Sequence, residues 1–268
     1  MSKKIVLVNP PNNRIVLRDF YSSTISKGKY NWPNTDLLSI SSVLNKSFET
    51  ILIDANTNRY SIDETLNIIS KKNDVIGAVV AIGKSVLKDD YLFLEKLSKL
   101  IKKQNQFAKI TVVGGIIYHN AFNEINNNKY IDACLLNFTT DDVHNYFRED
   151  YENLSNIIYR HNNQIIKTDL KLPEWGFKLP IPNHEQLPLN KYQLSHGKNK
   201  PLTSVLTSYG CPHKCSFCVS GRIQYRYRDP ENILEEIKYL LKIGVKEITF
   251  RDNIFGFHRK TAMKLLNG

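Results

Sequence analysis

The first 150 residues alternate between short apolar runs and segments whose apolar positions have helical spacing. The apolar runs predict strands at 5–8, 51–53, 75–82, 110–113 and 131–136. The helical spacing predicts helices near 36–44, 62–71, 89–103, 120–128 and 141–147. Continuously apolar strands separated by amphipathic helices are typical of a parallel sheet that is covered on both faces. We therefore expect an α/β fold that begins with a flavodoxin-like (Rossmann-like), doubly wound parallel sheet.

The turns after these strands are candidates for ligand contacts. In doubly wound sheets, ligands bind outside the carboxyl ends of the strands. This places four turns along one rim, at 9–11, 82–85, 114–115 and 137–140, although each could also be an ordinary βα turn. The segment 12–35 has no clear periodicity and is longer than usual βα loops, so we expect either a functional lid or local disorder there.

The pattern changes after residue 150. Residues 157–160 and 164–167, joined by His161, Asn162 and Asn163, predict a β-hairpin. Four of the ten prolines lie between 172 and 190, where neither a helix nor a central strand can persist. We expect three parts: a Rossmann-type domain at 1–150, a hairpin and proline-rich linker at 151–200, and a second βα unit at 201–268.

The second unit has clear helix signals. A strand is expected at 203–207, followed by a helix for which Asp229 is the N-cap and Pro230 the first residue. Gly244 stands where this helix should end. A strand at 245–250 and a helix near 258–266 follow, which is the start of a (β/α) barrel.

Composition narrows the choice of partners. The chain has 37 Lys and Arg against 26 Asp and Glu, a net charge of +11, but the basic residues are scattered, so a nucleic-acid partner is not expected. No apolar stretch is long enough for a membrane span and the N-terminus does not resemble a signal peptide, so we expect a cytoplasmic protein with no membrane contact. The four cysteines are then not expected to form disulfides.

Three cysteines stand close together as Cys211, Cys215 and Cys218, directly after a predicted strand. A zinc site that adds His213 or His196 is one alternative, and unliganded thiols are another. An iron–sulfur cluster is favoured, because four-iron clusters normally take four thiolates and a set of three leaves one iron open. A small molecule with an amine and a carboxylate could chelate that iron and receive an electron.

This cysteine spacing, with Phe217 before the last cysteine, resembles that of the radical S-adenosylmethionine (radical SAM) enzymes. The resemblance implies a 4Fe-4S cluster whose fourth iron binds S-adenosylmethionine (SAM). It also implies reductive cleavage to a 5'-deoxyadenosyl radical, with an external electron donor such as a flavodoxin or ferredoxin. By the same resemblance, Phe217 would border the adenine and Asp252 would lie near the methionine amino group.

The order of the parts is similar to that of the subgroup with an N-terminal cobalamin-binding domain. This similarity implies Asn9, Pro10, Ser85, Gly114 and Gly115 as cobalamin-binding candidates. Three departures leave cobalamin binding open. The aspartate–histidine signature is absent after the first strand, residues 137–140 replace an acidic glycine-rich turn, and Tyr209 replaces a common arginine.

The resemblance implies an enzyme that acts on an unidentified small molecule, with cobalamin serving methyl transfer or a rearrangement. The alternatives are a tRNA-modifying relative and a non-catalytic protein that holds zinc or a cluster for assembly. Residues 201–268 have room for two βα units, whereas a full barrel takes about 250 residues. We therefore expect a fragment of a longer polypeptide, or a partner chain that completes the barrel.

Overall fold

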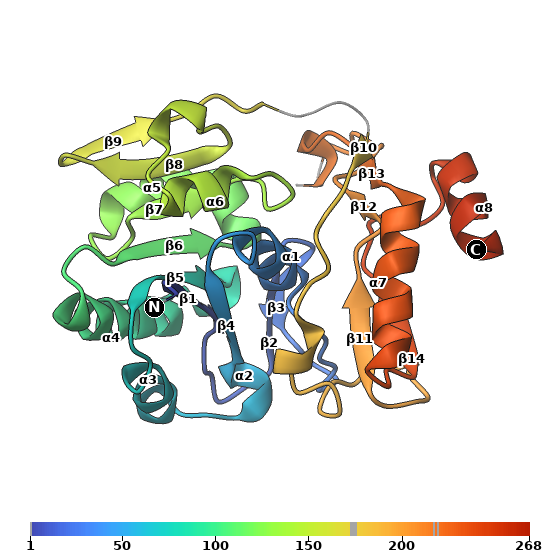
Figure 1. Cartoon of the computed structure of the whole chain (residues 1–268), viewed down its shortest axis with the longest axis horizontal. Helices are drawn as coiled ribbons and strands as arrows, with labels where there is room; N and C mark the ends of the chain where they lie inside the picture. Colours follow the sequence, from blue (N-terminus) through green and yellow to red (C-terminus); the bar gives the residue numbers. More distant parts are fainter. Residues whose placement is uncertain (1, 172–175, 217, 219) are drawn as a thin grey trace.

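The computed structural model describes residues 2–171, 176–216, 218 and 220–268, which form two α/β units packed against each other (Figure 1). The larger unit is built on a seven-stranded sheet and the smaller one on two parallel strands with their helices. Within the described residues, every helix is too short or too polar to cross a membrane.

The large sheet has the strand order of a flavodoxin-like fold. Its strands are β1 (Lys4–Asn9), β4 (Glu49–Asp54), β5 (Val75–Ala81), β6 (Lys109–Val113), β7 (Ala133–Leu135), β8 (Ile157–His161) and β9 (Gln164–Lys167). They lie in the order β4-β1-β5-β6-β7-β8-β9, and the first five are parallel. By chain position these five run 2-1-3-4-5, which is the flavodoxin-like order. The predicted fold class is confirmed.

The predicted hairpin is also present, as β8 and β9. It pairs antiparallel with β7 through Ala133 and Tyr159, among others, so the hairpin extends the large sheet.

Helices cover both faces of this sheet. They are α1 (Thr35–Leu44), α2 (Ala55–Asn58), α3 (Ile62–Ser70), α4 (Leu87–Gln104), α5 (Gly115–Asn127) and α6 (Asp142–Phe147). Ile5 and Leu7 of β1 share one core with residues of α1 and α6, whereas Val6 and Val8 share the other with α3, α4 and α5. Helix α5 begins earlier than predicted. A non-helical residue, Asn120, interrupts the helix, so its apolar spacing indicated only the part that follows this residue.

The segment without periodicity contains an ordered hairpin formed by β2 (Val16–Asp19) and β3 (Ser22–Ile25). We call residues 16–25 the rim segment. All four residues of β2 are buried, including the charged Arg18 and Asp19. A buried strand with two charged residues has no apolar pattern, which explains why the sequence did not reveal it.

A buried ion pair anchors the rim segment to the sheet. The Arg18 Nε and Nη2 atoms donate to the two carboxylate oxygens of Asp90 at 3.0 and 2.8 Å, and both side chains are fully buried. The backbone N–H of Gly83 donates to the same carboxylate at 2.8 Å. The pair therefore joins β2 to the start of α4 and to the turn after β5.

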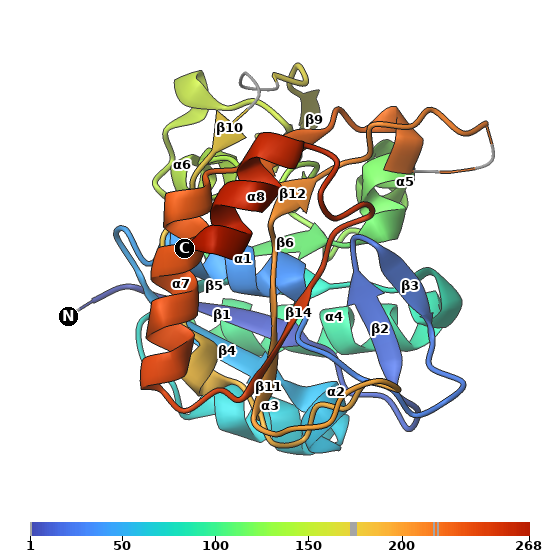
Figure 2. The same ribbon diagram turned by 90° about the vertical axis from the view of Figure 1, so that its right-hand side faces the viewer.

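The smaller unit is a βαβ arrangement (Figure 2). It consists of β11 (Leu202–Val205), α7 (Pro230–Lys242), β14 (Glu247–Phe250) and α8 (Arg259–Asn267). The two strands are parallel. The predicted caps are confirmed: the Asp229 side chain accepts from the backbone N–H of Asn232, and Gly244 follows the helix with a φ of +85°.

Shorter elements connect these parts. They are β10 (Gly176–Phe177), β12 (Ser208–Tyr209) and β13 (Arg226–Arg228), which form one small sheet, and the 3₁₀ turns η1 (Lys84–Val86), η2 (Tyr151–Asn153), η3 (His184–Gln186) and η4 (Ser220–Arg222).

A buried polar network fixes the connector against the smaller unit. The His184 ring bonds Glu236 of α7 at 2.8 Å and Thr203 of β11 at 2.9 Å, and Arg228 donates to the same glutamate. The network satisfies polar groups that would be costly to bury alone.

The Arg18–Asp90 pair leads to a first prediction. The Asp90→Asn substitution leaves Arg18 buried without a carboxylate, so we expect the free energy of unfolding to fall by about 3–5 kcal/mol. Urea denaturation measures the loss. The neighbouring, exposed Asp89→Asn should change stability by less than about 0.5 kcal/mol. Equal, small effects of the two substitutions would contradict a stabilising role for the pair.

A second prediction concerns Asp36, a fully buried residue in the first turn of α1 whose Oδ1 accepts from the backbone N–H of Phe20 at 3.0 Å. Burial, with the nearby Asp19 carboxylate adding to it, raises the pKa of Asp36 well above its usual range. The protonated carboxyl therefore stabilises the fold fully below the unfolded pKa of about 3.9, and this contribution is lost as pH rises through the higher folded pKa.

We expect the stability of the wild type relative to Asp36→Asn to decrease from about pH 4 to neutrality, because the amide cannot ionise. Urea denaturation of both proteins across this range tests it, and parallel stability curves would refute the shift.

Candidate functional site

The three clustered cysteines lie on a loop that leaves the smaller unit at the carboxyl end of β11. The loop is entered through β12 and Gly210, which has a φ of +79°. A Cβ atom at Gly210 would approach the Gln224 carbonyl oxygen to 2.4 Å, so only glycine fits here. The Asn253 side chain donates to the Gly210 carbonyl at 3.2 Å.

The end of the loop packs closely on its beginning. A Cβ atom at Gly221 would lie 2.7 Å from the His213 carbonyl oxygen and 3.3 Å from the backbone nitrogen of Cys215. The backbone N–H of Cys218 donates to the Cys215 carbonyl at 3.0 Å, and that of Cys211 donates to Ile223 at 3.4 Å. The loop is therefore folded back on itself, with all three cysteines on it.

The three thiols are free and accessible. Cys215 is exposed, Cys211 and Cys218 are half-buried, and none forms a disulfide. In the part of the chain that the structure describes, no three His, Cys, Asp or Glu side chains are arranged to hold a metal ion. The donor set fits a cluster in chemistry and accessibility, but its sulfurs are not gathered around a common point. Phe217, predicted beside the adenine, lies outside the described residues.

Asp252, which follows β14, faces the start of this loop. Its Oδ1 accepts from the backbone N–H groups of Thr207 and Ser208 at 3.0 and 2.5 Å and from the Ser208 hydroxyl at 2.9 Å. Its Oδ2 accepts from the Thr207 hydroxyl at 2.6 Å. Burial raises the pKa of Asp252, and these hydrogen bonds oppose the shift. Both oxygens thus hold the segment that leads to Cys211.

The five predicted rim residues do lie at the carboxyl edge of the large sheet, and each contacts the rim segment or its anchor. Arg18 Nη1 donates to Asn9 Oδ1 and to the Pro10 carbonyl, both at 3.1 Å. The Ser85 hydroxyl donates to the Ser23 carbonyl at 3.3 Å. A Cβ atom on Gly114 would lie 3.3 Å from the Arg18 carbonyl oxygen, and one on Gly115 would lie 3.2 Å from that of Phe20.

An aromatic cluster lies where the rim meets the smaller unit. The Phe20 ring lies 5.2 Å from Tyr209, 5.7 Å from Tyr118 and 6.1 Å from Phe138, between ring centroids, and Tyr209 lies 5.0 Å from Phe138. Burial, with the Asp252 carboxylate adding to it, raises the pKa of Tyr21. Its neutral hydroxyl donates to the Ser208 carbonyl at 3.2 Å.

The sequence did not indicate this cluster, because its members come from four separate segments. The unusual Tyr209 before the cysteine loop was the one available signal.

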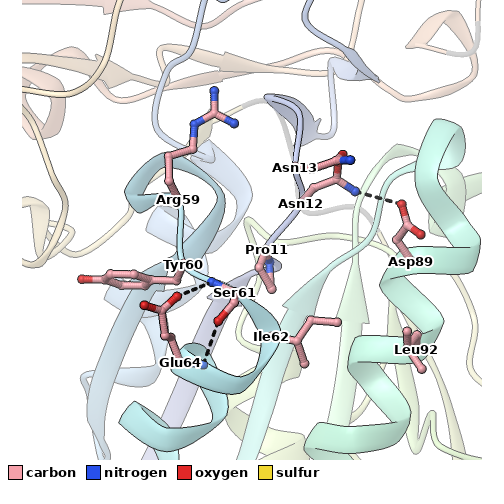
Figure 3. A pocket seen from close by; sticks show the side chains of 10 residues that line it. All are labelled: Pro11, Asn12, Asn13, Arg59, Tyr60, Ser61, Ile62, Glu64, Asp89 and Leu92. Carbon is pink, nitrogen blue, oxygen red and sulfur yellow. Dashed lines mark hydrogen bonds between the residues drawn. The ribbon is translucent and has the colours of Figure 1, made fainter.

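A surface cleft of about 530 Å³ lies beside the rim, between the loop after β1, the turn before α3 and the start of α4 (Figure 3). Four of its lining residues bond in two pairs: Asn12 donates to Asp89 at 3.0 Å, and Ser61 and Glu64 form a reciprocal capping box. We assign no ligand to this cleft.

Residues 205–260 match the family model of the radical SAM superfamily. The match contains all three clustered cysteines and Asp252.

Three curated relatives illustrate the similarity. An uncharacterized methyltransferase of Pyrococcus horikoshii is 36% identical over 93 residues, which cover 33% of this chain and 19% of the relative. The anaerobic magnesium-protoporphyrin IX monomethyl ester cyclase of Rubrivivax gelatinosus is 28% identical over 229 residues, which cover 79% of this chain and 40% of the relative. A tRNA-2-methylthio-N(6)-dimethylallyladenosine synthase of Natranaerobius thermophilus matches over a shorter stretch. It is 47% identical over 47 residues, which cover 17% of this chain and 10% of the relative. The chain thus spans less than half the length of these relatives.

Two solved structures share the fold. The radical SAM methyltransferase TsrM from Kitasatospora setae, with cobalamin and a [4Fe-4S] cluster bound, aligns with a TM-score of 0.67 and 15% identity, covering 100% of this chain and 50% of that one. The cobalamin-dependent radical SAM enzyme OxsB, with aqua-cobalamin and SAM bound, aligns with a TM-score of 0.71 and 15% identity. The alignment covers 99% of this chain and 37% of that one. At this identity the likeness establishes the architecture. The family match adds a similarity to the radical SAM superfamily over residues 205–260, which contain the cysteine loop.

Proposed function

We propose that Cys211, Cys215 and Cys218 bind a 4Fe-4S cluster and that the protein uses it to cleave SAM reductively. The observation that carries the proposal is the set of three free, accessible thiols on one loop at the carboxyl end of β11, within the residues that match the superfamily. Active sites of parallel βα units form at this end of the strands.

The number of thiols supports this function over electron transfer alone. Three protein thiolates leave one iron of a four-iron cluster without a protein ligand. When bound, the cluster would supply the electron that cleaves SAM to a 5'-deoxyadenosyl radical. An external donor such as a flavodoxin or ferredoxin would deliver that electron, and a small molecule would be the substrate. The chain's own part would be to supply three thiolates and to orient the loop that carries them.

We infer that the chain is organised in three parts. Residues 1–150 form the Rossmann-type domain, residues 151–200 form the hairpin and linker, and residues 201–268 form the start of the radical SAM barrel. Strand β14 is half-buried and, in the described part of the chain, pairs with β11 alone. Its free edge is where further βα units would enclose SAM and substrate, supplied by the same polypeptide or by a partner chain.

A tRNA-modifying function is the second candidate, and the net charge of +11 favours it. Relatives that modify tRNA with a second cluster would need further thiols. Cys134 is the one cysteine upstream of the loop, it is fully buried, and burial raises the pKa of its thiol. It cannot bind a second cluster, so we favour the small-molecule substrate.

Metal analysis after anaerobic reconstitution tests the cluster. We expect about four irons per chain with a broad visible absorbance, and less than about one iron in each single Cys→Ser variant at positions 211, 215 and 218. Cys134→Ala is the control and should keep the full iron content. One zinc per chain without visible absorbance would instead support the non-catalytic, zinc-binding alternative.

Asp252→Asn tests how the loop is oriented. Replacing one oxygen by an NH₂ group sets a donor against the donors of Thr207 and Ser208, so we expect about 1.5–3 kcal/mol lower stability and a reduced iron content. The electron paramagnetic resonance spectrum of any remaining reduced cluster should respond less to SAM. The exposed Asp63→Asn serves as control. If Asp252→Asn retains the wild-type iron content and SAM response, the carboxylate does not position the loop.

A further inference from the structure

We propose that the rim segment and Tyr209 fill the carboxyl edge of the large sheet, where ligands of doubly wound folds bind, so that the N-terminal unit of this chain supports the cysteine loop without a bound corrinoid. This inference concerns the rim alone and is independent of cluster binding. Three observations carry it.

The first observation is the use of the glycines at the rim. Glycines after the strands of a doubly wound sheet allow a ligand to approach the backbone closely. Here Gly114, with a φ of +129°, faces the Ile82 and Arg18 carbonyl oxygens, which a Cβ atom would approach to 2.5 and 3.3 Å. Gly115 faces the Phe20 carbonyl in the same way, at 3.2 Å. The chain's own backbone therefore uses the space that these glycines create.

The second observation is the filling of the crevice between β1 and β5, where the strand order reverses and ligands of such folds bind. The Arg18 side chain lies there, fully buried, bonded to Asp90, Asn9 and the Pro10 carbonyl. Asn9 also donates to Asp54 at 2.9 Å, so both ends of its amide are engaged.

The third observation is the aromatic cluster between the rim segment and the cysteine loop. Phe20 and Tyr209 are both buried, and their rings lie among those of Tyr118 and Phe138 at the distances given above. The Tyr21 hydroxyl bonds the backbone of Ser208, two residues before Gly210. A corrin ring placed between the rim and the loop would overlap these side chains.

Displacing the rim segment would be strongly unfavourable. It would leave Asp90 buried without its guanidinium and expose Val16, Leu17 and Phe20 to water. The segment therefore behaves as part of the core and not as a cover that a ligand can lift.

Hydroxocobalamin binding tests the proposal on the full chain, before and after cluster reconstitution, with the cobalamin-binding TsrM as positive control. We expect no co-elution of cobalamin with the protein in gel filtration and no change in its melting temperature, because a ligand that binds only the folded state must raise it. Binding of about one cobalamin per chain would overturn the proposal.

Two further measurements separate a fixed segment from a displaceable one. Hydrogen exchange should show the same amide protection in residues 16–25 with and without hydroxocobalamin, and loss of protection on its addition would overturn the proposal. The Phe20→Ala variant should melt at a lower temperature by the same amount in both conditions. Iron content, measured on the same samples, reports on the cluster separately, so failure of one proposal is distinguishable from failure of the other.

Discussion

The buried ion pair between Arg18 and Asp90 is the interaction on which the arrangement of this molecule depends. All three guanidinium nitrogens have acceptors, which is the condition under which a buried charge pair can be accommodated. The pair holds the rim segment at the carboxyl edge of the large sheet. The contacts of Phe20 and Tyr21 with the smaller unit follow from that placement.

The cysteine loop is thereby supported from two sides. From the smaller unit, Asp252 binds Thr207 and Ser208, and Asn253 binds Gly210. From the N-terminal unit, the rim segment contributes the hydroxyl of Tyr21 to the same stretch of backbone. A second contact joins the units beside it, where Asp19 pairs with Arg251 at 3.5 Å. The loop entrance is thus a junction between units, and the loop beyond it carries the exposed Cys215 and the half-buried Cys211 and Cys218.

Much of the architecture was predictable because its signals are local. Apolar runs identified the strands of the large sheet, and helical spacing identified the helices that cover it. Asp229, Pro230 and Gly244 marked the ends of α7. The rim segment was not predictable, since a strand with Arg and Asp at its end is buried only if partners elsewhere neutralise it. Its partner Asp90 lies 72 residues away in the sequence.

The sequence by itself determined the fold class, the order of the elements and the chemistry of the donor set, since the number and type of the three thiols on one short segment do not depend on the fold. Only the tertiary structure decided what surrounds them. It turned Asp252 toward the backbone of β12, placed Tyr209 against Phe20 and Phe138, and filled the rim with the chain's own side chains. The physical reason is that periodicity and spacing act over a few residues, whereas burial of a charge or an aromatic ring depends on groups that only the complete fold brings together.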